Sequence, residues 1–205
     1  MEHFPTYRRR GASLLLVAAL GLAGSTAQAS PITYTAILSG AAEAPPNASP
    51  GLGLAFVTLD LEAHTMRVGV TFADLLGFVT AAHVHAATAE PFTGTAGVAT
   101  STPTFPGFPA GVSFGTYSSL FDMTLASSYN AAYLNNVING GDPLIAEASL
   151  AQAAADGRAY FNIHTNLYPG GEIRGFLEPV PEPASILLLG TGLAGLGARR
   201  LRRRR

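Results

Sequence analysis

The sequence contains no cysteine and no lysine. Without cysteine the chain can form no disulfide, so an exported fold would have to rest on its hydrophobic core alone. Any metal site would also lack thiolates and would depend on imidazole or carboxylate ligands. A body of about 150 residues buries roughly 68–70% of its unfolded surface, which is enough for such a core.

Basic residues are scarce in the middle of the chain. Nine of the 12 arginines lie near the two ends, and only Arg67, Arg158 and Arg174 lie between residues 30 and 180. Eleven carboxylates give that region a formal charge of −8, although the whole chain carries only −1. Nucleic-acid binding needs clustered cations, so we exclude a nucleic-acid partner. An acidic body is compatible with cation binding or with simple solubility.

Residues 1–29 have the three parts of a secretory signal peptide. Arg8–Arg10 form a positive region, the apolar run 14–23 follows, and Ala27 and Ala29 define an A-x-A cleavage site. The apolar run is too short to span a bilayer, which takes about 20 residues. We therefore predict that signal peptidase cleaves after Ala29.

Residues 179–205 form a second targeting signal. Pro181, Glu182 and Pro183 interrupt regular structure, fifteen apolar or small residues follow over 184–198, and an arginine cluster closes the chain. As a helix the apolar part would span roughly 22 Å, short of a bilayer's ~30 Å core, with the arginines on the cytoplasmic side. The tail resembles the PEP-CTERM sorting signal, which implies transient membrane insertion and removal by an exosortase-type enzyme in bacteria that make exopolysaccharide. A permanent single-helix anchor is the alternative.

Short apolar runs separated by turn residues predict a mainly β domain over residues 30–178. We expect strands at 32–38, 53–60, 65–73, 80–86, 112–124, 158–164 and 172–178, with a further short strand at 96–101. Helical spacing predicts helices over 127–138 and 143–155, before the last hairpin. About seven short strands favour an antiparallel β-sandwich with this helical insertion.

Three histidines are candidates for a metal site. Strand alternation places His83 and His85 on one face of their strand and His164 on the polar face of another. A symmetric last hairpin would place Glu172 across from His164. Three imidazoles, with Glu172 as fourth ligand or orienting partner, would suit Zn²⁺ or copper. The alternative is a neutral hydrogen-bonded network with Glu172 and Arg174 that fixes the end of the sheet.

A structural polar network is expected beside these histidines. The same hairpin symmetry places Asn162 across from Arg174. Glu43 precedes a rigid Pro-Pro turn and is either a partner of Arg174 or a loop charge. His64 lies in a predicted turn, where we expect it to be solvated.

Four motifs, in order over about residues 32–178, resemble the CHRD domain. They are Gly40–Pro46, Ala82–His85, Tyr160–Thr165 and Pro169–Gly175. The resemblance implies an extracellular β-sandwich, so we expect a mainly all-β fold of the immunoglobulin-like or superoxide-dismutase-like kind. It implies no established enzymatic activity. Ala86 and Ala87 stand where many members have glycine and proline, so we expect that loop to bend differently.

Two targeting signals flank a domain that has no catalytic constellation, and this organisation favours a non-catalytic module. We expect it to be exported across the inner membrane of a Gram-negative-type bacterium and held at the cell surface. Signal peptidase, an exosortase-type enzyme, and envelope or exopolysaccharide components are the expected partners. The alternative is a metal-binding or redox-active extracellular protein that uses the His-x-His pair with the third histidine.

Overall fold

The computed structural model describes residues 30–181 together with positions 192 and 200. The predicted signal peptide with Ala27 and Ala29, and the tail residues Glu182 and Pro183, lie outside the described residues. Two helices and eight strands are described. The strands are β1 Ile32–Ser39, β2 Leu52–Asp60, β3 Thr65–Ala73, β4 Val79–Ala86, β5 Gly115–Asp122, β6 Ala159–Thr165, β7 Ile173–Phe176 and β8 Glu178–Pro179; the helices are α1 Ala131–Leu134 and α2 Pro143–Ala155, and the 3₁₀ turns are η1 Gly40–Ala42 and η2 Ala126–Ser128.

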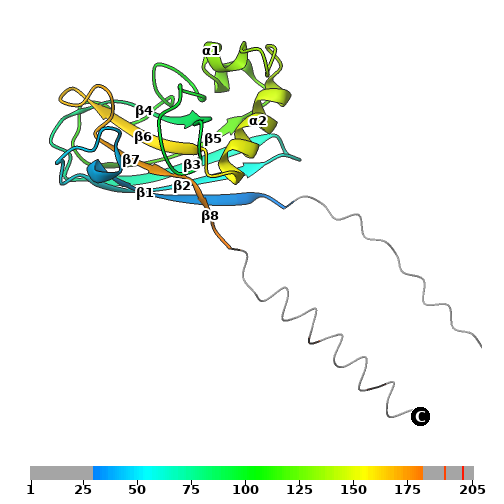
Figure 1. Ribbon diagram of the computed structural model, residues 1–205, viewed down its shortest axis with the longest axis horizontal. Coiled ribbons are helices and arrows are strands. Elements are labelled where there is room, and N and C mark those ends of the chain that lie inside the picture. Colours follow the sequence, from blue (N-terminus) through cyan, green and yellow to red (C-terminus); the bar gives the residue numbers. More distant parts are fainter. Residues whose placement is uncertain (1–29, 182–191, 193–199, 201–205) are drawn as a thin grey trace, which may run out of the picture.

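The mainly β, antiparallel fold expected from the sequence is confirmed, and the strands form one continuous sheet. Their order is β4-β6-β7-β1-β2-β3-β5, with β8 beside β1. β7 pairs with both β6 and β1, and so joins the two halves of the sheet. The sheet curls, and Figure 1 shows β4 and β6 above the layer of β1, β2 and β3, with α2 at one side.

Alternating burial along the long strands builds the core between these layers. In β2 the side chains of Ala55, Val57 and Leu59 are buried, whereas Leu54 and Phe56 face solvent. This period of two is the expected consequence of the pleat. Phe105, from the long connection between β4 and β5, stacks on Phe161 with ring centroids 5.9 Å apart. The connection therefore contributes to the core although it has little regular structure.

Two expected elements are much shorter than predicted. The helix expected over 127–138 is reduced to η2 and α1, because side chains satisfy the backbone locally. Asn130 caps α1 by accepting from the Ala132 amide, and Asn136 accepts from two later amides where the helix would continue. The strand expected over 96–101 forms only isolated bridges, one of which joins Val98 to His85.

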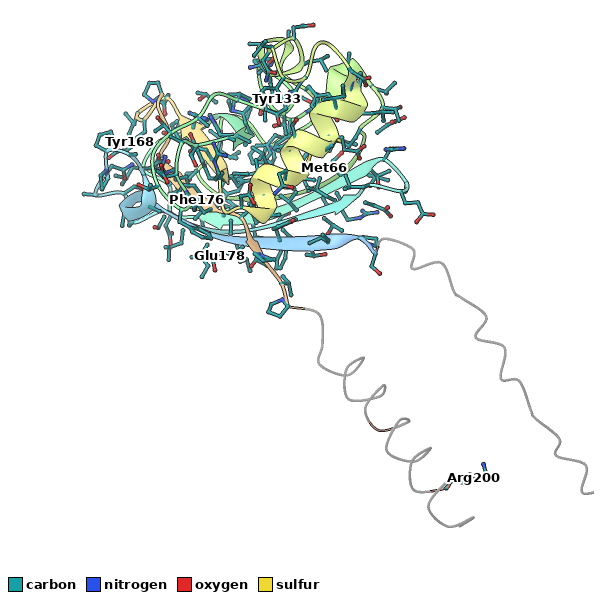
Figure 2. The ribbon with its side chains drawn as sticks, turned by 45° about the vertical axis from the view of Figure 1, so that its right-hand side comes forward. Met66, Tyr133, Tyr168, Phe176, Glu178 and Arg200 are labelled. Atoms are coloured by element: carbon teal, nitrogen blue, oxygen red, sulfur yellow. The ribbon has the colours of Figure 1, made fainter. Side chains whose placement is uncertain are left out.

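Helix α2 forms where the sequence predicts it. Asp142 caps it by accepting from the Leu144 amide at 2.9 Å, and Pro143 takes the first turn, where its missing N–H costs nothing. Within residues 30–181 no helix is long and apolar enough to cross a membrane. Figure 2 shows Tyr168, in the turn between β6 and β7, at the opposite end of the domain from α2, and Glu178 where the chain leaves the domain.

Candidate metal centre

The antiparallel pair β4 and β6 presents one apolar and one polar face. Val84 and Phe161 are paired across the strands and point into the core. His83 is paired with Asn162 on the opposite face, which loops cover. His83 is therefore only 6% exposed and His85 only 7% exposed, while His164 is partly exposed.

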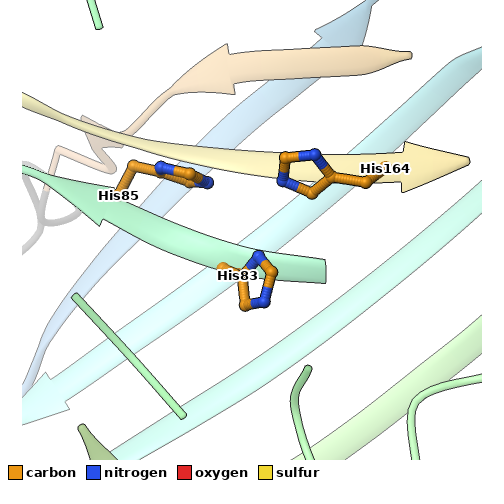
Figure 3. A group of neighbouring side chains, drawn as sticks. All are labelled: His83, His85 and His164. Carbon is orange, nitrogen blue, oxygen red and sulfur yellow. The ribbon is translucent and has the colours of Figure 1, made fainter. Parts of the chain in front are cut away.

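The three imidazoles converge on one point. His83 and His85 come from β4 and His164 from β6, and their rings face a common space (Figure 3). The ring centroids are 5.3–5.7 Å apart. One nitrogen from each ring lies within 4.8 Å of the corresponding nitrogens of the other two. The structure thus brings together the three histidines that strand alternation singled out.

Backbone carbonyls fix the tautomer of each ring. A carbonyl oxygen only accepts, so the ring nitrogen beside it carries the proton. These bonds run from His83 Nε2 to the Pro103 oxygen at 2.7 Å, from His85 Nδ1 to the Ala96 oxygen at 2.9 Å, and from His164 Nδ1 to the Pro169 oxygen at 2.9 Å. The second nitrogen of each neutral ring then carries a free lone pair. His83 Nδ1, His85 Nε2 and His164 Nε2 have no partner among the described residues.

Burial keeps these rings neutral. Loss of solvation lowers the pKa of His85 to about 4 and outweighs the carbonyl of Ala96, which raises it. Burial lowers the pKa of His83 and of His164 for the same reason. Neutral imidazoles are the form that can bind metal ions, and burial favours this form in all three rings.

Glu172 lies outside this group, unlike the fourth ligand predicted from the sequence. Its carboxylate accepts from the hydroxyls of Ser49 and Thr165 at 2.6 and 2.7 Å, and from the amides of Leu76 and Gly77. These bonds lower its pKa although burial alone would raise it. Strand β7 begins only at Ile173, so strand alternation does not extend to Glu172. The Glu172 carboxylate accepts a hydrogen bond from Thr165 and makes none with His164 among the described residues.

The network expected around Arg174 is partly present. Arg174 pairs with Asn162 across β7 and β6, as the hairpin symmetry predicts. Its Nε donates to the Ala42 oxygen and lies 3.8 Å from Glu43 Oε2. Burial raises the pKa of Glu43 to about 7 even though Arg174 lowers it. No hydrogen bond joins Arg174 or Glu172 to the three histidines in the described part of the chain, which differs from the predicted histidine network.

Tyr160 is a neighbour of the site whose role the sequence reading missed. Its ring stacks on His85 with centroids 4.8 Å apart, and its hydroxyl lies 3.2 Å from the Ala96 amide nitrogen. The guanidinium carbon of Arg174 lies 4.8 Å from the same ring. Tyr160 stands four residues before His164 in β6, so strand alternation puts both side chains on one face, and this spacing was the available signal. The carbonyls that orient the histidines come from irregular loops and left no signal in the sequence.

His64 is not part of this group and has a partner of its own. Its Nδ1 lies 2.7 Å from Oε2 of Glu147, a residue of α2 that is only 2% exposed. The side chain expected to be solvated therefore ties the β2–β3 turn to α2.

The geometry allows one ion to share the three nitrogens. With metal–nitrogen bonds of about 2.0–2.1 Å, tetrahedral ligands lie roughly 3.3 Å apart. The nitrogens lie within 4.8 Å of one another, so a shared ion would draw them closer together. The backbone carbonyls behind each ring are the outer partners that orient metal-binding histidines in proteins.

Comparison with known families gives two matches. The CHRD domain matches residues 34–177, which contain the three histidines of the cluster. The PEP-CTERM protein-sorting motif matches residues 179–204. No curated protein and no solved structure matches the chain.

Proposed function

The chain belongs to the CHRD domain family and carries a PEP-CTERM sorting motif, which make it an exported, surface-sorted protein, and we propose that it binds a zinc or copper ion there. The ligands are His83, His85 and His164. The protein acts as a non-catalytic module of the envelope or exopolysaccharide matrix.

The observation that carries this proposal is the set of unpartnered nitrogens. Buried polar atoms in proteins nearly always have a partner, and each exception costs about 1–3 kcal/mol. Six such side-chain atoms occur among the described residues, and three of them are the facing nitrogens of this one cluster. Three costs concentrated at one point are offset if a cation accepts all three lone pairs.

The surroundings of the cluster favour binding over catalysis. A metal-dependent hydrolase needs a general base beside the metal-bound water. Glu172 is enclosed by four hydrogen bonds, and Glu43 lies beside Arg174. Neither belongs to the group of three histidines.

Substitutions that keep the carbonyl contacts test this proposal. His85→Asn, His164→Asn and His83→Gln retain a donor to the backbone oxygen but lack the ligating nitrogen. Metal titration of the full chain should give one zinc or copper ion per chain, and His85→Asn should weaken binding roughly 100-fold or more. His64→Asn, which preserves the donor to Glu147, is the matched control and should bind like the wild type. Equal binding by all these variants would refute the site.

The envelope role depends on the sorting motif. Removal of residues 179–205 should leave the protein exported but misdirected, because the exosortase-type enzyme has no signal to process. Fractionation of cells that carry the full and shortened chains would compare their distribution. Identical distribution and processing of the two would contradict a role that depends on sorting.

A further inference from the structure

The three-histidine site contains no negative charge. All three donors are neutral imidazoles, and no carboxylate of the described residues joins the group. The Arg174 guanidinium contacts the ring of Tyr160, which stacks on His85. Glu43 lies beside Arg174 and is engaged by it rather than by the histidines.

We infer that the site selects monovalent copper, Cu(I), over Zn²⁺, and this inference rests on the proposed metal-binding function. The juxtaposition that carries it is a group of three neutral donors, two of them buried, beside a tyrosine ring that the Arg174 guanidinium contacts. Cu(I) is bound by three imidazoles as a three-coordinate ion that needs no further ligand.

Charge is the first reason for this selectivity. The desolvation cost of an ion grows with the square of its charge, so a divalent ion costs about four times as much to bury as a monovalent one of equal size. Proteins normally offset that cost with anionic ligands. With His83 and His85 buried and no anionic ligand in the group, the site offsets the smaller cost better.

Coordination number is the second reason. Structural zinc sites have four protein ligands, and sites with three keep water or another group in the fourth position. Here the described residues supply three nitrogens. Zn²⁺ would therefore have to bring water or an external anion into the site as its fourth ligand, whereas three-coordinate Cu(I) needs none.

Competition titrations of the full chain test the selectivity. Cu(I) would be titrated against bicinchoninate without oxygen and under reducing conditions, and Zn²⁺ against a colorimetric zinc chelator at the same pH. We expect one Cu(I) per chain and an affinity at least 100-fold higher than for Zn²⁺. Added azide should strengthen Zn²⁺ binding and leave Cu(I) binding unchanged.

The outcomes separate this inference from the proposed function. If Zn²⁺ bound as tightly as Cu(I) or more tightly without azide, and His85→Asn abolished this binding, the selectivity would be overturned but the metal site would stand. Binding of neither ion would refute the metal site itself. Asn162→Asp, which adds a carboxylate opposite His83, should move the affinity ratio at least tenfold toward Zn²⁺. An unchanged ratio in this variant would contradict the charge argument.

Discussion

The ring of His85 lies flat on the ring of Tyr160, with centroids 4.8 Å apart and planes 6° apart. The two residues also share Ala96. Its carbonyl accepts from His85 Nδ1, and its amide nitrogen lies 3.2 Å from the Tyr160 hydroxyl. Tyr160 therefore holds the imidazole from its face and anchors the loop that fixes its tautomer.

Tyr160 should accordingly control metal affinity without being a ligand. Tyr160→Leu removes the stacking partner and the hydroxyl, and should weaken metal binding about 10–100-fold, as expected for residues that orient ligands. Tyr160→Phe keeps the stack and should lose less. Metal titration with urea unfolding of the same samples distinguishes affinity from stability. Affinities equal to the wild type in both variants would show that the stack does not orient His85.

Gly171 permits the close packing between the polar network and the β6–β7 turn. Its φ of 131° is strained for other residues, and an added β-carbon would lie 2.6 Å from Glu43 Oε1 and from the Asn162 amide nitrogen. Gly171→Ala should therefore lower the free energy of unfolding by roughly 2 kcal/mol or more. Gly170→Ala is the matched control, because no atom lies within 4 Å of its added carbon. Similar urea midpoints for the two variants would contradict this packing.

The stability of the domain should depend on pH through Glu43. Burial raises its pKa in the folded chain from the ordinary 4.5 to about 7. The folded state thus binds the Glu43 carboxyl proton more tightly than the unfolded state does. The stabilisation from this protonation is lost as pH rises from about 4.5 to 7. Glu43→Gln removes the cost of ionisation and should stabilise the protein at pH 8 by up to about 3 kcal/mol.

Urea unfolding between pH 4 and 8 measures this effect. The two proteins should converge near pH 4, where Glu43 is protonated in both states. The histidines act in the opposite sense, because their lowered pKa values remove stability as pH falls below 6.5. A constant difference between wild type and Glu43→Gln across this range would show that Glu43 does not titrate there.

Acid should release the metal at a lower pH than it would from histidines with an ordinary pKa. Protons compete with metal for the lone pairs, and burial lowers the pKa of all three rings, that of His85 to about 4. Affinity measured at decreasing pH should therefore stay nearly constant down to pH 6.5 and decline only below it. A steep decline that begins above pH 7 would show that the rings are not desolvated.

Much of this arrangement was predictable because it depends on strand alternation. The period of two placed His83 and His85 on one face, and hairpin symmetry paired Asn162 with Arg174, which is the register observed. Both deductions use only local geometry within strands.

The errors lie where strands end and loops begin. Glu172 turns toward Thr165 because β7 starts one residue later, and alternation does not apply there. The carbonyls of Pro103, Ala96 and Pro169 orient the histidines from loops whose course no periodicity encodes. The charge balance of the site was also not predictable, since it depends on how the loops orient the carboxylates near the histidines.

Anomalous X-ray diffraction from crystals of the copper-loaded protein tests the central claim most directly. We expect one strong peak at the copper edge, about 2.0 Å from His83 Nδ1, His85 Nε2 and His164 Nε2. A peak elsewhere on the chain, or none at this cluster at full copper loading, would contradict the three-histidine site.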